Sequence, residues 1–315
     1  MTPMPRARGF TLVELMVAIT IGLIIVAAIT NIFLASRSTY NAQDRLARLQ
    51  ENGRFAMQFL ARDLRMAAYY GCLDDLTAVN STLTSGAGLA FNISSALDGL
   101  DNAAGNWFPS GNTVLPTDIL PGTDALIVRM VDQPSSVAVS TTMPNESAVL
   151  RVTDVTGFNT NDIVVVSDCA SADVMQVTQV ITGANPALQH NPTGLNATQK
   201  LSKAYKPPAQ VFRFASQMYY VRNGTPPTLW RTTNGGAGEE LVQGVEDLQI
   251  LYGVDTDTPP DGLPNVYLKA GENGLKSADD WSRVKTVRAT ITARTLDTVD
   301  VQRRVFLTTT LLRNM

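Results

Sequence analysis

The residues of this chain that could do chemistry are few, and the first is an acid beside an apolar segment. Glu14 is followed by Leu15 to Ala35, a stretch without any charged residue. A charged side chain at membrane depth costs roughly 2.5 to 3.5 kcal/mol, so a carboxylate there needs a positive partner. The surrounding apolar sequence offers none, which predicts that the partner belongs to another chain. The alternative is that Glu14 snorkels to the lipid headgroups.

Two cysteines, Cys72 and Cys169, are the second candidate pair. In an exported domain such a pair is more typical of a disulfide than of a metal site, and two unpaired thiols are the alternative. The bridge would close a loop of about 100 residues, which in the chain-entropy view stabilises the fold by roughly 4 to 5 kcal/mol. Because His190 is the only histidine, the sequence cannot supply the usual Cys/His zinc site.

A short acidic segment, with Asp255, Asp257 and Asp261 followed by a glycine, has features of a calcium loop. Oxygen ligands at alternating positions can surround a hard cation, and glycine permits the turn. However, Pro259-Pro260 occupies the positions where an EF-hand needs its third ligand and its glycine. We therefore favour an ordinary acidic hairpin loop and keep calcium as the weaker alternative. No other cofactor is expected.

The sequence contains no recognisable catalytic constellation. His190 lies in a loop context, Gln189-His190-Asn191-Pro192, without a nucleophile or base pattern, and it is predicted to be exposed and inert. A Walker loop, a dinucleotide fingerprint and a metalloprotease helix are all missing from the sequence. We therefore expect a protein that is not an enzyme.

The composition is that of a folded protein with a mildly acidic surface. The 315 residues are 44% hydrophobic and 17% charged, and 25 basic residues stand against 28 acidic ones. This is enough apolar sequence for a core, so disorder is not expected. A net charge of −3 without basic runs also argues against nucleic acid as a partner.

The apolar segment predicts a single membrane anchor. At about 1.5 Å per residue, Leu15 to Ala35 would form a helix near 31 Å long, enough to cross a hydrocarbon layer of ~30 Å. Arg6 and Arg8 precede it and would keep that end in the cytoplasm, leaving the remainder in the periplasm. The alternative is a signal peptide cut near Val26-Ala27-Ala28, but helical character continues beyond that point.

Beyond the anchor the helix becomes amphipathic, and a β-rich region follows it. We divide the chain into residues 1–9, a transmembrane part at 10–35, an amphipathic part at 36–70 and a periplasmic head at 71–315. Apolar residues and a glycine recur at three- and four-residue steps through the amphipathic part, and Gly71 is predicted to end it in the left-handed conformation. Residues 77–122 are polar and weakly periodic, and we expect them to form a long surface excursion.

Short alternating segments predict the strands of the head. The clearest is Val287 to Arg294, with Val301 to Leu312 as its antiparallel partner. Earlier candidates are Ala125 to Val131, Ala148 to Val152, Asp162 to Ser167, Met175 to Ile181, Val211 to Phe214, Gln217 to Val221 and Val245 to Tyr252. The expected fold is α+β, a roll in which one long helix packs on a mostly antiparallel sheet.

The sequence RGFTLVEL at residues 8–15 resembles the class III leader junction of type IV prepilins and type II secretion pseudopilins. The resemblance implies that a prepilin peptidase removes residues 1–9 by cutting after Gly9 and that Phe10 is then N-methylated. Glu14 would become the fifth residue of the mature chain. Its implied partner is the positively charged amino terminus of the neighbouring subunit in a filament.

Four further segments resemble the PilW class of minor pilins: NGRFAMQFLARDLRMAAYYGC at 52–72, SDCASADVMQV at 167–177, YGVDTD at 252–257 and DDWSRVKTVRATITART at 279–295. This resemblance implies a subunit that primes type IV pilus assembly with other minor pilins and the major pilin. It would pass from the inner membrane to the extracellular pilus tip, beneath an adhesin, and support twitching motility and adhesion. The alternatives are a J-like minor pseudopilin of type II secretion and, less favoured, a membrane-anchored periplasmic binding protein or enzyme.

Overall fold

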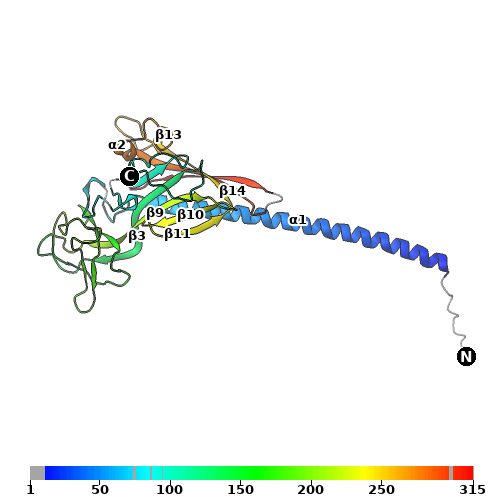
Figure 1. Cartoon of the computed structure of the whole chain (residues 1–315), viewed down its shortest axis with the longest axis horizontal. Coiled ribbons are helices and arrows are strands. Elements are labelled where there is room, and N and C mark those ends of the chain that lie inside the picture. The colour runs from blue at the N-terminus through cyan, green and yellow to red at the C-terminus, as the bar shows by residue number, and fades with distance from the viewer. Residues whose placement is uncertain (1–10, 74–75, 86, 94, 298–300, 315) are drawn as a thin grey trace, which may run out of the picture. The chain divides into compact units, whose positions relative to one another are not determined.

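The structure, a computed structural model, describes residues 11–73, 76–85, 87–93, 95–297 and 301–314. The chain divides into two compact units, residues 1–48 and residues 49–315. The boundary falls inside one 55-residue helix, α1 (Leu12–Met66) (Figure 1). Each unit is therefore described on its own, and we call the second unit the head.

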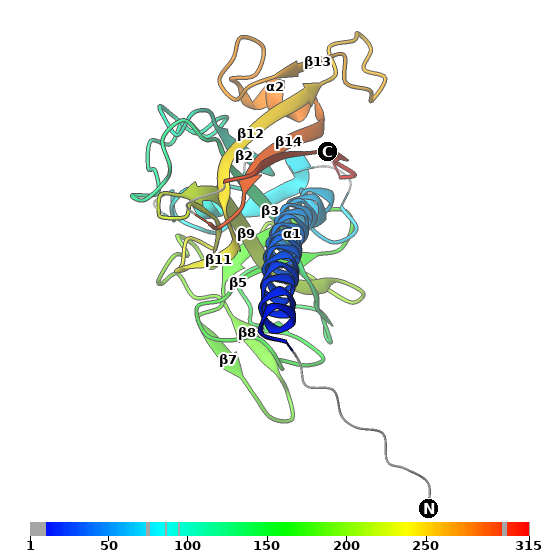
Figure 2. The same cartoon turned by 90° about the vertical axis from the view of Figure 1, so that its right-hand side faces the viewer.

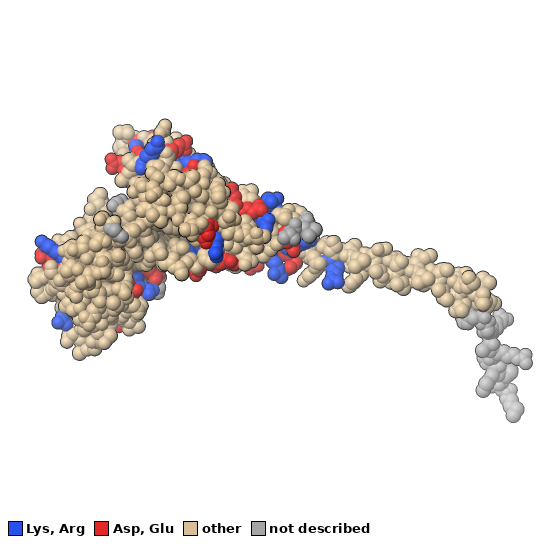
Figure 3. Space-filling view, in the orientation of Figure 1, with Lys and Arg blue, Asp and Glu red and all other residues tan. Residues whose placement is uncertain are grey.

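The first unit consists of the amino-terminal part of α1. Thr11 caps it, because its Oγ1 accepts a hydrogen bond of 3.2 Å from the backbone N–H of Glu14. Every side chain from Thr11 to Asn41 is exposed, and α1 is long and apolar enough there to cross a membrane. Figure 3 shows few charged side chains along this stretch. A hydroxyl without a hydrogen bond would be costly in lipid. Thr20 and Thr30 avoid this cost, because their hydroxyls donate to backbone carbonyl oxygens of the same helix.

Within the head, the last turns of α1 bury one face. The buried side chains recur at helical steps and include Leu49, Ala56, Leu60 and Leu64. Gly53 also lies on this face, and a β-carbon at Gly53 would stand 2.1 Å from the ring of Phe306. The absence of a side chain at Gly53 therefore lets the aromatic ring lie directly on the helix backbone.

The helix ends differently from the prediction. Ala68, and not Gly71, is the first residue after α1 with a positive φ, which is 62°. Its N–H donates to the carbonyl oxygen of Arg129 at 3.0 Å, and its side chain is buried. This hydrogen bond to the sheet ends the helix one turn earlier than the glycine would. Gly71 is also left-handed, but it shapes the turn that follows.

An eight-stranded sheet forms the centre of the head. One edge of its long strand β9 (Gln210–Arg222) pairs with β3 (Ala125–Ala138), which pairs in turn with β2 (Leu97–Leu100). The other edge of β9 pairs with β5 at one end and with β10 at the other. The remaining strands are β1 (Val79–Ser81), β5 (Ile163–Ser167), β6 (Ala172–Gln176), β10 (Thr228–Thr233) and β11 (Gly238–Gln243). Only β1 and β6 pair in parallel among the strands that the structure describes.

A second sheet of four strands has the order β13-β12-β14-β15 and is antiparallel. Its strands are β12 (Val245–Val254), β13 (Val266–Leu268), β14 (Val284–Arg294) and β15 (Arg303–Leu311). The short helix α2 (Ala278–Ser282) precedes β14 and carries Trp281, whose buried ring lies 4.6 Å from that of Tyr252. The predicted antiparallel pairing of the last two strands is thus confirmed.

A third sheet completes the head. It consists of β4 (Leu150–Arg151), β8 (Ala187–Gln189) and β7 (Gln179–Ile181), again antiparallel. It packs on its own apolar cluster, which includes Phe158, Leu188 and Val211. Figure 2 shows β7 and β8 at one end of the head and the four-stranded sheet at the other. The α+β fold with a mostly antiparallel head is as predicted.

Three expectations about the head were wrong. The predicted strands Val211–Phe214 and Gln217–Val221 are one continuous strand, β9. The predicted strand Met175–Ile181 is split between β6 and β7, which belong to different sheets. Residues 77–122 form a surface excursion only in part, because β2 is entirely buried within the central sheet and Trp107 is also buried, whereas residues 108–122 are exposed or half-buried. Two short 3-10 helices, η1 (Leu76–Ala78) and η2 (Leu89–Phe91), lie in the same region.

Candidate functional site

The candidate assembly residue Glu14 lies in the first turn of α1. It occupies the third helical position, and its side chain is exposed. It is the only charged residue between Leu12 and Ser36. Within the described part of the chain, no basic side chain forms an ion pair with it. The predicted processing residues Gly9 and Phe10 lie outside the described residues, so their roles stay predictions.

The predicted disulfide is present and joins Cys72 to Cys169. Cys72 follows the end of α1 by a few residues, and Cys169 lies in the tight turn between β5 and β6. Their Cα atoms are 4.7 Å apart, although they are separated by 97 positions in the sequence. The bridge therefore fastens the segment after the helix to a hairpin of the central sheet.

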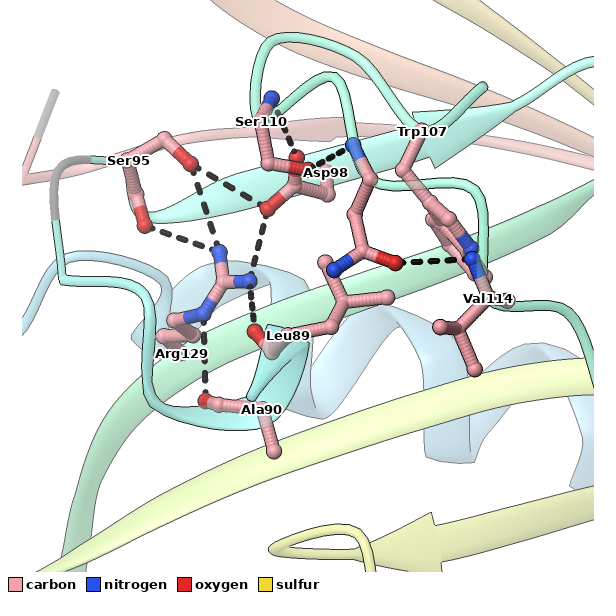
Figure 4. Close-up of polar contacts among 9 residues, drawn as sticks. Leu89, Ala90, Ser95, Asp98, Trp107, Ser110, Val114 and Arg129 are labelled. Atoms are coloured by element: carbon pink, nitrogen blue, oxygen red, sulfur yellow. Dashed lines mark hydrogen bonds and ion pairs between the residues drawn. The ribbon is translucent and has the colours of Figure 1, made fainter. Parts of the chain in front are cut away.

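A buried ion pair, Asp98 with Arg129, explains why β2 belongs to the core although residues 77–122 are mostly polar (Figure 4). Asp98 on β2 and Arg129 on β3 approach to 2.6 Å, and neither side chain is exposed to solvent. The guanidinium group also donates to the backbone carbonyl oxygens of Leu89, Ala90 and Ser95. A buried charge needs this degree of compensation, so the pair holds η2 and the following loop on the sheet.

A second buried acid, Asp63, lies on the head's part of α1. Tyr219 on β9 donates its hydroxyl to the Asp63 carboxylate at 2.5 Å. Arg231 on β10 lies 3.9 Å from the same carboxylate. Burial raises the pKa of Asp63, and burial together with the neighbouring Asp63 raises the pKa of Tyr219. Sequence reasoning missed this cluster, because its members come from three elements that are distant along the chain.

The acidic loop after β12 brings Asp255, Asp257 and Asp261 together, with one ligand atom of each within 4.8 Å of the others. Asp255 is already occupied, since its two oxygens accept backbone N–H bonds from Asp257 and Gly262 at 3.0 and 2.7 Å. These bonds are those of a tight acidic loop. The weak prediction of a calcium site there is not tested by this geometry and stays a prediction.

His190 differs from the prediction, which placed it in solvent. The residue is 1% exposed, and its Nε2 lies 2.9 Å from the carbonyl oxygen of Ala148. Burial lowers its pKa, so the neutral ring that donates to Ala148 is favoured. The loop context of its neighbours predicted exposure, whereas packing against the third sheet hides the side chain. It helps to hold that region together.

Two comparisons with protein families agree with this arrangement. The prokaryotic N-terminal methylation motif matches residues 4–30, which include Gly9, Phe10 and Glu14. In this segment the chain is similar to pilin-related proteins that carry the motif, a class that is in general structural and not enzymatic.

The second family, Type IV Pilus-assembly protein W, matches residues 218–305, which extend from the end of β9 into β15. No curated protein and no solved structure matches the chain. The two family matches support a pilin-related role in the type IV pilus and are consistent with a PilW-class minor pilin. The resemblance drawn from the sequence is thereby confirmed.

Proposed function

We propose that this protein is a minor pilin that primes type IV pilus assembly and lies at or near the pilus tip. The observation that carries the proposal is the first unit of the structure. Its apolar side chains are exposed, and its one acid, Glu14, has no basic partner among the described residues. Such a surface is stable in lipid or against the apolar helices of other subunits, but not in water.

The proposed assembly step pairs this acid with a second molecule. Cleavage after Gly9 by a prepilin peptidase would free the amino group of Phe10, which would then be methylated and remain positively charged. In a filament this group would meet Glu14 of the adjacent subunit. The attraction between the two charges grows as water is excluded, so an incoming subunit in the correct axial position is favoured over one that is displaced.

The proposed location follows from where each unit is stable. The helix would lie in the inner membrane, with the head in the periplasm, until other minor pilins and the major pilin join it in a filament. The large head, residues 49–315, fits a terminal position, where its bulk does not obstruct helical packing. From there it would support twitching motility and adhesion, with a tip adhesin above it. The role is structural, and we assign no catalytic residue.

A second candidate, the J-like pseudopilin of type II secretion, shares the leader and the long helix. The match to a pilus-assembly family favours the pilus over the secretion system. Deleting the gene separates the two: pilus use predicts loss of surface pili with normal export of exoproteins. Loss of exoproteins with normal pili would support the secretion system instead.

The central test is Glu14→Val, with Glu51→Val as the matched control. Both residues are exposed acids on α1, and only Glu14 lies in the apolar part. We expect Glu14→Val to be processed and inserted into the membrane but not incorporated, so that surface pili are lost. Glu51→Val should assemble normally. Mass measurement of the mature chain and electron microscopy of pili provide the readouts.

Two results would overturn this proposal. One is normal piliation by Glu14→Val in a strain that lacks the wild-type gene. The other is a native chain that begins at a residue other than Phe10.

A further inference from the structure

We propose that a basic groove on the head binds an acidic segment of a neighbouring pilus subunit. The groove has a volume of about 650 Å³ and lies between the last turns of α1, strands β3, β9 and β10, and the segment after β15. Four of the side chains that line it are arginines: Arg62, Arg65, Arg231 and Arg313. The positive charge of the groove follows from its lining residues alone. The identification of the partner as a pilus subunit rests on the proposed function.

The acids of the groove do not neutralise these arginines. Asp132 pairs with Arg213 at 2.8 Å. Asp63 is buried and accepts the hydroxyl of Tyr219. It lies 3.9 Å from Arg231, which also pairs with Glu239 at 2.5 Å. Asp63 attracts Arg62 as well, although the two form no ion pair. Arg62, Arg65 and Arg313 are exposed, and no carboxylate of the described residues forms an ion pair with them. Three positive charges therefore surround one hollow.

The like charges of these arginines repel one another, and an acidic ligand would relieve this repulsion. Arg62 and Arg65 are three residues apart on α1, so they share a face and repel each other. Arg313 adds a third charge, and its neighbours hold it in place. Asn314 donates to the carbonyl oxygen of Ala67 at 3.1 Å, and the N–H of Leu312 donates to the carbonyl oxygen of Lys285 at 2.9 Å. These bonds fix the segment on both sides of Arg313 and preorganise the basic rim.

The chemistry of the groove selects carboxylates on a flexible chain. A guanidinium group binds a carboxylate through two parallel hydrogen bonds, which a single lysine cannot match. Met66, Met130 and Ala215 also line the groove, and their apolar surface can receive the aliphatic stems of glutamate side chains. A hollow of this size accommodates a few residues. The protein as a whole is acidic, with a net charge of −3, so this groove is a local exception.

The test measures peptide binding by the full-length chain in detergent micelles. The probe is a short fluorescein-labelled peptide rich in glutamate, and its glutamine counterpart is the uncharged reference. We expect the glutamate peptide to bind more tightly, with an affinity that falls as salt rises. The double variant Arg62→Glu, Arg65→Glu should bind the glutamate peptide about ten-fold more weakly or worse. Two exposed ion pairs with the peptide would be lost, and repulsion between like charges would replace them.

The matched control is Arg45→Glu with Arg48→Glu, which makes the same change at the same spacing on the same helix but outside the groove. This variant should bind the peptide as the wild type does. Arg313→Gln, in an exposed segment, provides a milder change that should weaken binding without loss of fold. Tryptophan fluorescence melting checks the fold, because the three tryptophans all lie in the head.

Three outcomes would overturn the groove. The first is equal binding of the two peptides, and the second is unchanged binding by the Arg62 and Arg65 variant. The third is displacement of the peptide by inorganic phosphate at the same concentration of charge, which would indicate a site for free anions. Failure of Glu14→Val to block pilus assembly would contradict the proposed function instead and would leave the peptide result unaffected.

Discussion

The two parts of α1 belong to one continuous helix, yet their apolar side chains have opposite surroundings. Leu15 and Leu23 are 56% and 65% exposed, whereas Leu60 and Leu64 are completely buried. Each buried leucine contributes about 1.5 to 3 kcal/mol relative to an exposed one. The head therefore provides apolar packing for its own part of the helix. The first part needs an apolar environment from outside the chain, such as a membrane or a filament.

Loss of the disulfide should produce the largest difference in stability between the head and the first part of α1. Replacing Cys72 and Cys169 by serine opens a loop of 97 residues, and we expect the head to lose roughly 4 to 5 kcal/mol of stability. The first part of α1 should be unaffected, since the bridge lies entirely within the head. Urea unfolding followed by tryptophan fluorescence reports the head, and amide exchange in micelles reports residues 12–48. A head of unchanged stability would show that the bridge does not constrain it.

A smaller effect should come from the two glycines of α1, which form a matched pair. Gly53→Ala should destabilise the head by ~1 to 3 kcal/mol, because the new methyl group meets the Phe306 ring. At Gly22 a new methyl group would have no atom within 4 Å, so Gly22→Ala should be neutral or should stabilise the helix slightly. Thermal melts of both variants in micelles test the difference. Equal melting temperatures would contradict the close packing of Phe306 on α1.

The smallest effect concerns pH and is confined to the head. Burial raises the pKa of Asp124 to about 6, although its oxygens accept N–H bonds from Asn102 and Ile250. The folded state therefore binds this proton more tightly than the unfolded state does. Its contribution to stability is fully present below the ordinary pKa of an aspartate and is lost as pH rises through about 6.

Asp124→Asn isolates this contribution, because asparagine does not titrate. The stability of the wild type relative to the variant should fall between pH 4 and pH 6.5, a window set by the ordinary and raised pKa values. Urea unfolding across that range provides the measurement. A constant difference would mean that Asp124 titrates alike in the folded and unfolded states.

Local patterns in the sequence were sufficient for the elements whose signals are local. The apolar run predicted the first part of α1, strict alternation predicted β14, and an exported pair of cysteines predicted the disulfide. Each of these signals depends on residues close together in the chain or on chemistry that has few alternatives. Glu14 was singled out for the same reason, since a lone acid beside an apolar helix needs a partner.

The features that sequence reasoning missed depend on partners far along the chain. Residues 77–122 looked solvent-exposed because they are polar and weakly periodic, but Arg129 compensates the buried acid of that range, Asp98, inside the core. The helix ends at Met66, because the N–H of Ala68 donates to the backbone carbonyl oxygen of Arg129 and not to the helix. The basic groove could not be predicted either, because Arg231 on β10 and Arg313 in the segment after β15 both lie more than a hundred positions beyond Arg62. Such pairings become visible only when the chain is folded.

The position of the Cys72–Cys169 bridge also has a mechanical consequence. A pulling force applied to α1 travels along the helix and arrives at Cys72 shortly after Met66. From there a covalent link transfers the load directly to Cys169, in the hairpin of β5 and β6. The 97-position span between the two cysteines is bypassed and carries no tension. Strands β1, β2 and β3 within that span would thus be protected from being peeled away by such a force.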